Sequence, residues 1–259
     1  MVLELVNEVR LTMPRLGTRK LYYILEKEMK ELGVGRDRLF SILKANHMLI
    51  KPTKIYHVTT NSHHRFRKHK NLIESFEISQ PEQVWVADIT YVGNRSNPMY
   101  LSLITDAYSK KIMGYNLSNS LETTGSIKAL KMAVKSRMYP EQALIHHSDR
   151  GLQYCSNDYQ NIIQRNQISC SMTESYDPYQ NAIAERINGI LKQEFLPNSR
   201  NIDIQIMETI VKQSVRIYNQ MRPHWSCSML TPDQMHLQKQ LKIKTYKNKK
   251  LQELQLLEF

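Results

Sequence analysis

Three acidic residues stand in settings that suit metal-assisted cleavage of a phosphodiester. Asp88 lies inside the apolar run 84–92, Asp149 follows a short apolar run, and Glu185 belongs to a segment with helical spacing. Thirty-five residues, positions 150 to 184, lie between the second acid and the third. Magnesium prefers oxygen ligands, and two such ions stabilise the attacking and leaving oxygens of an in-line displacement. We therefore predict that Asp88 bridges two Mg²⁺ ions, that Asp149 binds one of them, and that Glu185 binds the other.

Each of these acids, taken alone, also has an ordinary structural explanation. An aspartate after a strand is commonly a turn former or a helix cap, and a glutamate in a helix is commonly solvated. His147, two residues before Asp149, fits a structural role at least as well as a supporting role at the site. The sequence has no GxxxxGK[ST] loop, so ATP hydrolysis is not indicated. The prediction therefore depends on the three carboxylates acting together.

The segment 181–192 predicts a helix with one polar face that includes Glu185. Asn181, Glu185, Asn188 and Lys192 recur at i, i+4, i+7 and i+11, so they share that face. Lys192 lies about two turns beyond Glu185 and can reach a phosphate. The face is a candidate substrate surface. The alternative, which this helix alone favours, is an amphipathic helix that shows solvent a mixed polar face.

Composition and charge limit the class of protein. With 259 residues and 41% hydrophobic content, the chain can build one medium core and one or two small flanking units. A formal net charge of +12 favours a polyanionic partner, because neutralised phosphates release their counterions. No apolar stretch approaches the roughly 18 residues of a membrane span. The three cysteines form no CxxC pair, and we expect them reduced in a cytoplasmic protein.

The first 50 residues alternate apolar and charged residues at helical spacing. Thr18 is placed to cap a helix, the segment 33–35 breaks the pattern, and a second helix begins at Arg36. Two short helices across a glycine-containing turn resemble a helix-turn-helix unit. The spacing fits a plain helical hairpin and a DNA-reading unit equally well.

Two basic segments flank the predicted core. Positions 51–70 carry six Lys or Arg and no acid, and 239–250 carry six Lys and no acid. We predict that the first is a linker that contacts a DNA backbone, with a solvated basic loop as the alternative. For the second, a DNA-contact strip and a solvated end fit equally well.

The apolar periods between these segments predict a core of order βββαβαβα. We expect strands at 84–92, 99–105, 112–117, 143–145 and 168–172, and helices at 123–138, 157–165 and 181–192. This order is that of an α/β (α+β) ribonuclease H-like fold, in which helices flank a mixed five-stranded sheet. Beyond this core we expect a further helix from about 203 to 221. The chain then divides into a helical unit (1–50), a basic linker (51–80), a catalytic core (81–200), and a C-terminal helix with a basic tail (201–259).

Four ordered blocks resemble those of the DDE transposases of bacterial insertion sequences, whose core is similar to retroviral integrase. They are VWVADITY at 84–91, HSDRGLQY at 147–154, NAIAE at 181–185 with Lys192, and a block that runs from Tyr218-Asn219 through Arg222-Pro223-His224 to Leu230-Thr231-Pro232. The resemblance covers roughly residues 14 to 236. Gln180, Trp225 and Cys227 depart from the pattern of many relatives, and none of them belongs to the triad.

The resemblance implies an activity, a cofactor and a set of partners. Such enzymes use Mg²⁺ or Mn²⁺ to nick the terminal inverted repeats of the element, and the freed 3′-OH attacks another phosphodiester. Asp88, Asp149 and Glu185 match the catalytic triad, and Lys192 matches a basic residue near the reacting DNA end. The segment 14–49 resembles the small helical DNA-binding unit of the family. The further DNA contacts expected are Asn181, Arg186, Asn188, Arg19, Lys20, Arg36 and Arg38.

The resemblance also leaves a second hypothesis open. Relatives are often made as a frameshift fusion with an upstream reading frame that carries another helix-turn-helix and a leucine zipper. A chain without that portion fits a DNA-binding regulator or assembly subunit that needs the fused form for activity. We expect either version to act in the bacterial cytoplasm, with the nucleoid, as a homo-oligomer on element-end and target DNA.

Overall fold

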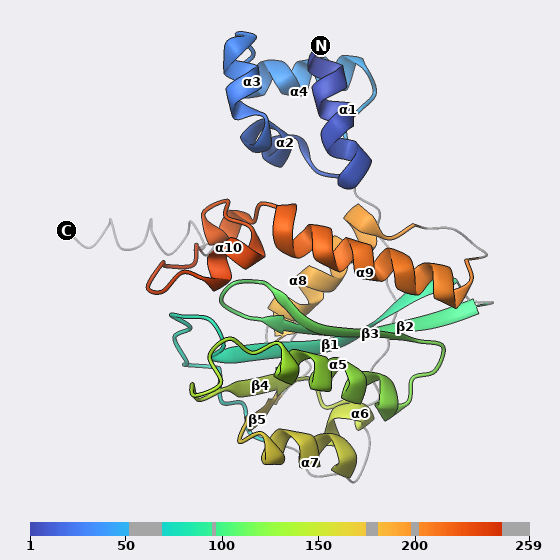
Figure 1. Cartoon of the computed structure of the whole chain (residues 1–259), viewed down its shortest axis with the longest axis vertical. Helices are drawn as coiled ribbons and strands as arrows, with labels where there is room; N and C mark the ends of the chain where they lie inside the picture. The colour runs from blue at the N-terminus through green and yellow to red at the C-terminus, as the bar shows by residue number, and fades with distance from the viewer. Residues whose placement is uncertain (52–68, 95–96, 175–180, 198–201, 245–259) are drawn as a thin grey trace.

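A computed structural model describes residues 1–51, 69–94, 97–174, 181–197 and 202–244 (Figure 1). These residues form a small helical unit at the N-terminus and a larger unit built on one sheet. Most of the basic segment 51–70, and the basic tail beyond 244, lie outside the described residues, so their contact with DNA stays a prediction. Across the ranges given above, no helix is long and apolar enough to cross a membrane.

A mixed five-stranded sheet in the order β3-β2-β1-β4-β5 forms the core. The strands are β1 (Val84–Asn94), β2 (Asn97–Asp106), β3 (Ile112–Ser118), β4 (Ile145–Ser148) and β5 (Ser169–Met172). β1 is central, since it pairs antiparallel with β2 and parallel with β4. The predicted ribonuclease H-like α/β class is confirmed.

Helices cover both faces of this sheet (Figure 1). One face carries α5 (Thr123–Lys135), α6 (Leu152–Cys155) and α7 (Asn157–Arg165), and the other carries α8 (Ala182–Ile190), the π-helical turn η2 (Leu191–Phe195) and α9 (Ile204–Met221). Side chains alternate along a strand, so Trp85 and Ile89 pack with the first group while Val84 and Val86 pack against α8. Asp88 falls on the same face as Val84 and Val86, and therefore points toward α8.

The fourth strand differs from its expected place at 143–145. β4 begins at Ile145 and continues through two histidines that are fully buried. His146 Nε2 lies 2.8 Å from the Tyr159 hydroxyl, and His147 Nδ1 lies 2.8 Å from Ser171 Oγ. Each hydrogen bond engages one nitrogen of a buried ring, so a polar segment can occupy a position that hydropathy assigns to apolar residues.

The N-terminal unit has four helices and a core of its own. They are α1 (Val2–Thr12), α2 (Thr18–Ile24), α3 (Glu26–Glu31) and α4 (Arg36–Ala45). The helix expected from Arg36 is present, but the capping role expected of Thr18 is wrong. Thr18 is instead the first, buried residue of α2, and Gly17 precedes it without a side-chain cap. Phe195 and Ile217 of the larger unit pack against the apolar core of this helical unit.

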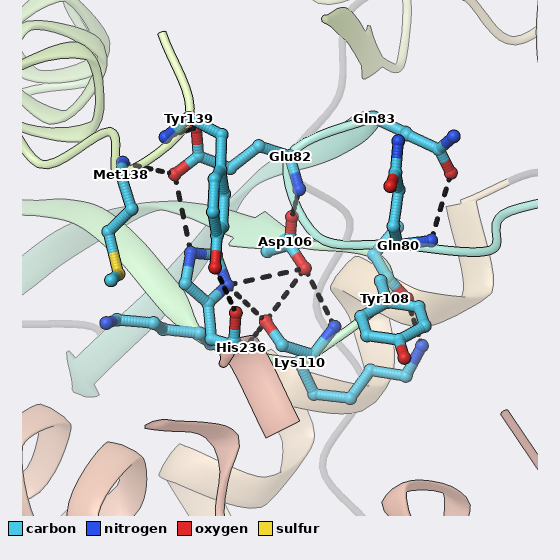
Figure 2. A network of polar contacts seen from close by, with 12 residues as sticks. Gln80, Glu82, Gln83, Asp106, Tyr108, Lys110, Met138, Tyr139 and His236 are labelled. Carbon is cyan, nitrogen blue, oxygen red and sulfur yellow. Dashed lines mark hydrogen bonds and ion pairs between the residues drawn. The ribbon is translucent and has the colours of Figure 1, made fainter. Parts of the chain in front are cut away.

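A buried polar network ties the C-terminal segment to the start of β1 (Figure 2). His236, at the end of α10 (Pro232–His236), places Nε2 3.3 Å from Glu82 Oε1 and Nδ1 2.9 Å from Ser109 Oγ. Burial raises the pKa of the Glu82 carboxyl, but hydrogen bonds from His236, Met138 and neighbouring groups outweigh it and leave that pKa lowered. The network anchors α10, and the short helix η3 (Trp225–Cys227) precedes it.

Candidate active site

Asp88 on β1 lies beside Asp149, which directly follows the neighbouring strand β4. β1 and β4 run parallel with Val86 opposite His147, and continuing that register by two residues brings Asp149 beside Asp88. Asp149 follows the last residue of β4, where its Oδ1 accepts a hydrogen bond of 3.0 Å from the backbone N–H of Gly151. The sheet thus brings together two carboxylates that are far apart in the sequence.

The Asp88 carboxyl has a strongly perturbed pKa. Burial is the largest cause and the charge of Asp149 the next, and together they raise the pKa of Asp88 from 3.8 to about 7. Hydrogen bonds from Asn188 and the backbone of Ile89 act in the opposite direction, and the charge of Glu185 adds a smaller upward contribution. The site therefore concentrates negative charge where solvent screens it poorly.

Polar residues of α8 and η2 contact β1 on either side of Asp88. Asn188 Nδ2 donates to Asp88 Oδ2 at 2.7 Å, and Asn181 Nδ2 donates to the Ala87 carbonyl at 3.1 Å. Lys192 Nζ lies 3.4 Å from Thr90 Oγ1. Three members of the helical face predicted from the spacing, Asn181, Asn188 and Lys192, turn toward the sheet, whereas Glu185 is exposed. Asn181 and Asn188 are 7% and 4% exposed, so their amides bond protein groups and are not presented to DNA in this conformation.

Glu185 lies on helix α8, and its side chain is more exposed than that of Asp88 on β1. Its side chain is exposed on α8, and partial burial raises the pKa of its carboxyl. Its charge acts on Asp88, so it belongs to the same neighbourhood. Within the part of the chain that the structure describes, no three His, Cys, Asp or Glu side chains are arranged to share a metal ion. The structure therefore brings Asp88 and Asp149 together and leaves Glu185 nearby.

The basic residues predicted to contact DNA fall into two groups. Arg19, Arg36 and Arg38 are exposed on the helical unit, and Arg36 Nε donates to Asp37 Oδ1 at 2.9 Å. Lys20 is half-buried against the larger unit, where burial is the main cause that lowers its pKa to about 8. Arg186 is exposed on α8 beside Glu185. Lys192 is partly buried, and burial lowers its pKa although the charge of Asp88 opposes the shift.

Known protein families match the part of the chain that contains Asp88, Asp149 and Glu185. Integrase core domain families match residues 78–178 and 166–232. The insertion element IS600 31 kDa protein of Shigella sonnei is 36% identical over 220 residues, which are 83% of this chain and 79% of that protein. The chain belongs to the insertion-sequence transposases with an integrase core domain. The transposase InsF of insertion sequence IS3A in Escherichia coli K12 is 34% identical over 167 residues, 64% of this chain and 58% of InsF.

One solved structure, a viral intasome, shares the fold of this chain. A chain in the cryoEM structure of the simian T-cell lymphotropic virus intasome in complex with the PP2A regulatory subunit B56 gamma is 19% identical. It aligns over 89% of this chain and 78% of its own with a TM-score of 0.53. The catalytic core of HTLV-2 integrase, in complex with magnesium, aligns over 61% of this chain and 97% of its own with a TM-score of 0.47.

Sequence reasoning did not single out Tyr154, which lies close enough to the two aspartates to feel their charge. Its ring is buried on α6, and its hydroxyl has no hydrogen-bond partner in the described part of the transposase. Burial raises the pKa of that hydroxyl well above its usual value, and the charges of Tyr159, Asp149 and Asp88 raise it further. Tyr154 is the last residue of the block HSDRGLQY, and its place in that block was the available signal. Hydropathy alone does not distinguish it from an ordinary core tyrosine.

Proposed function

We propose that this chain cleaves DNA at the ends of an insertion sequence and joins the freed 3′ end to target DNA, with Asp88, Asp149 and Glu185 as the catalytic triad. The observation that carries the proposal is the adjacency of Asp88 and Asp149 across β1 and β4, together with a pKa of Asp88 raised to about 7. Perturbed carboxyl groups concentrate at functional sites, because a folded protein otherwise avoids them.

The residues at this site fit a divalent cation. Carboxylate oxygens are the ligands that Mg²⁺ and Mn²⁺ prefer, and a cation would remove the repulsion that raises the pKa of Asp88. The Asn188 side chain, besides donating to Asp88, has a buried amide oxygen without a partner among the residues described here. That oxygen can accept a hydrogen bond from a water of a hydrated ion. When bound, two such ions would supply charge stabilisation for phosphodiester cleavage and joining.

Each of the predicted site residues has a proposed role around those ions. Asp88 and Asp149 would hold the metal, and Glu185 would complete the ligand set from α8. Lys192 is proposed to touch the DNA near the reacting end, because its ammonium group lies beside Thr90 on the strand that carries Asp88. We also propose that the remaining predicted basic residues contact DNA: Arg19, Arg36, Arg38, Lys20 and Arg186. Asn181 and Asn188 are better placed to hold β1 and Asp88 in position.

Triad variants test this function directly. Asp88→Asn, Asp149→Asn and Glu185→Gln should each reduce cleavage and joining of end-containing DNA about a thousand-fold or more, because metal charge stabilisation is worth several kcal/mol. Asp158→Asn and Glu208→Gln are matched controls on exposed helix positions, and they should keep full activity. DNA affinity should change little in all five variants. Full activity in any triad variant would remove that residue from the assignment.

A DNA-binding regulatory or assembly subunit is the second candidate function. The position of Glu185 favours it, because no three-ligand group is assembled within the described ranges. On this account the chain would bind element ends as part of an oligomer and would need a fused upstream segment for chemistry. Incubating the purified chain with Mg²⁺ and end-containing DNA separates the two candidates. Cleaved and joined products support the transposase role, whereas binding without cleavage, rescued by adding a fused form, supports the regulatory one.

A further inference from the structure

Residues 69–80 form a strap of irregular structure that leads from the basic segment into β1. Ile73 and Ile78 of this strap pack against the apolar cluster that includes Val86 of β1. That cluster lies on the face of the sheet that carries α8, and Asp88 points to the same face. The strap and the candidate metal site therefore share one side of the sheet.

Hydrogen bonds tie the strap to the edge strand β5. The Met172 N–H donates to the Lys70 carbonyl at 3.3 Å, and the Leu72 N–H donates to Ser171 Oγ at 2.9 Å. β5 is the last strand of the sheet order, so its outer edge has no neighbouring strand within the described residues. The strap thus pairs polar groups that an edge strand otherwise leaves to solvent.

The Ser171 hydroxyl connects the strap to β4. Besides accepting from Leu72, Ser171 Oγ lies 2.8 Å from His147 Nδ1. Ser171 and His147 are fully buried and are register partners, and His147 is in turn opposite Val86. Paired residues point to the same face of a sheet, so these contacts lie on the face that carries α8. Water does not compete with them there, which strengthens the connection.

The connected end of β4 is the end that carries Asp149. His147 precedes Asp149 by two residues, and the backbone between them is held by the Thr173 N–H, which donates to the Ser148 carbonyl at 3.0 Å. β4 and β5 have only four residues each, so their ladder contains few hydrogen bonds. A side-chain contact between two such short strands therefore has a large share in fixing where β4 ends.

We propose that Ser171 is a positioning residue for the candidate metal site, because it joins Leu72 of the strap to His147 and so fixes the end of β4 where Asp149 lies beside Asp88. Ser171 itself touches neither metal nor DNA in this role. The inference rests on the proposed function, since it takes Asp149 as a ligand of a divalent cation. Groups behind a metal ligand change metal affinity about ten- to a hundred-fold when they are removed. Ser171 acts through a strand, so we expect the lower end of that range.

Mn²⁺ binding in the absence of DNA tests the proposal without any measurement of activity. Electron paramagnetic resonance counts the free ion, and Ser171→Ala should weaken Mn²⁺ binding about ten-fold. Ser102→Ala is the matched control. It also removes a buried hydroxyl, but Ser102 Oγ lies 3.4 Å from Ser126 Oγ of α5, on the opposite face of the sheet, so affinity should be unchanged. A folded Ser171→Ala chain with wild-type Mn²⁺ affinity overturns the proposal.

Changes at Leu72 test the strap from its other side. Leu72→Pro removes the N–H that donates to Ser171, whereas Leu72→Ala keeps it and alters only a side chain that is 44% exposed. Leu72→Pro should weaken Mn²⁺ binding like Ser171→Ala, and Leu72→Ala should not. The double variant of Leu72→Pro and Ser171→Ala should lose no more than either single variant, because both remove the same bond. Losses that multiply to about a hundred-fold would overturn the proposal.

Cleavage of end-containing DNA at rising Mn²⁺ concentration separates positioning from a purely structural role. Ser171→Ala should regain activity at high Mn²⁺ with unchanged DNA affinity, because its metal site is weakened and not removed. Reduced stability together with an unchanged Mn²⁺ midpoint would assign Ser171 to the scaffold alone and overturn the proposal. Circular dichroism checks the fold of each variant, and Leu72→Pro carries the test if Ser171→Ala does not fold.

Asp149→Asn distinguishes failure of this inference from failure of the proposed function. It should abolish the tight Mn²⁺ binding of the wild type. If Asp149→Asn loses that binding while Ser171→Ala keeps it, this inference fails and the proposed function survives. If Asp149→Asn binds Mn²⁺ as tightly as the wild type, the proposed metal site fails, and the positioning role of Ser171 fails with it.

Discussion

Replacing Asp88 with asparagine is expected to stabilise the metal-free chain. The pKa of Asp88 rises from 3.8 to about 7 on folding, mainly through burial and then through the charge of Asp149. A shift of about three units corresponds to about 4 kcal/mol, since each unit is worth about 1.4 kcal/mol. Asp88 retains some exposure, so solvent screens part of this energy. We therefore expect the variant to gain about 2 kcal/mol in the free energy of unfolding.

The gain has a defined dependence on pH. Between about pH 4 and pH 7 the folded chain holds a proton on Asp88 that the unfolded chain has released, so stability falls as pH rises. Below about pH 4 the carboxyl is protonated in both states and its destabilising effect disappears. Above pH 7 the effect is fully present. The advantage of Asp88→Asn should therefore be largest at pH 8 and should shrink by more than half at pH 5.

Urea unfolding followed by circular dichroism, with EDTA at pH 8 and pH 5, measures this difference. The single oxygen of the asparagine can accept the 2.7 Å hydrogen bond from Asn188, but its amide nitrogen then replaces the oxygen that accepts from the backbone N–H of Ile89 at 2.9 Å, and this lost bond offsets part of the gain. Asp158→Asn, at an exposed position in the first turn of α7, is the matched control and should change stability by less than about 1 kcal/mol. An Asp88→Asn variant that is less stable than the wild type at pH 8 would refute the electrostatic reasoning.

Adding Mg²⁺ should make the wild type more stable than Asp88→Asn, the reverse of their order in EDTA. A metal that binds only the folded wild type stabilises it by about 2.7 kcal/mol at a hundred times its Kd. This gain exceeds the advantage of about 2 kcal/mol expected for Asp88→Asn, which should not respond to the ion. If Mg²⁺ stabilises both proteins equally, Asp88 is not a metal ligand.

Two further substitutions test the scaffold. A Cβ at Gly114 of β3 would meet the carbonyl oxygen of Ala129 in α5, so Gly114→Ala should cost about 2 kcal/mol. Gly189→Ala in α8 meets nothing within 4 Å and should gain up to about 1 kcal/mol, and thermal unfolding of both variants compares them. Arg222→Met leaves Glu194 without its buried partner and should cost about 3 kcal/mol, whereas adding Glu194→Gln should recover part of that loss. A double variant no more stable than Arg222→Met alone would argue against the ion pair.

The arrangement of strands and helices was largely predictable because most elements carry a strong apolar period. The run from Val84 to Val92 has the length and composition of a central strand, and β1 extends it by two residues to Asn94. The helix expected at 157–165 matches α7 in both bounds. α6, by contrast, spans only Leu152–Cys155, and such a short helix has no period to detect.

The site was predictable only in part. The motifs identified Asp88, Asp149 and Glu185 as candidates, but the pairing of β1 with β4 depends on long-range register that a sequence pattern does not contain. The spacing of Asn181 and Asn188 correctly predicted a shared helical face. It gave no indication that this face turns toward the sheet, because periodicity defines a face and tertiary packing decides what covers it. The catalytic role of the three acids stays a prediction.

Amides are well suited to the face of α8 that meets β1. Asn181 and Asn188 donate to a backbone carbonyl and to Asp88 without adding charge, so they satisfy buried acceptors near the carboxylates. A carboxylate at position 188 would raise the pKa of Asp88 still further, and a lysine there would form a fixed ion pair that competes with a bound cation. Lys192 lies one turn farther along and its ammonium group is next to Thr90, so the positive charge stays near Asp88 without occupying its oxygens. The helix thereby orients Asp88 without an ion pair to its oxygens, so a divalent cation would not have to displace a protein cation.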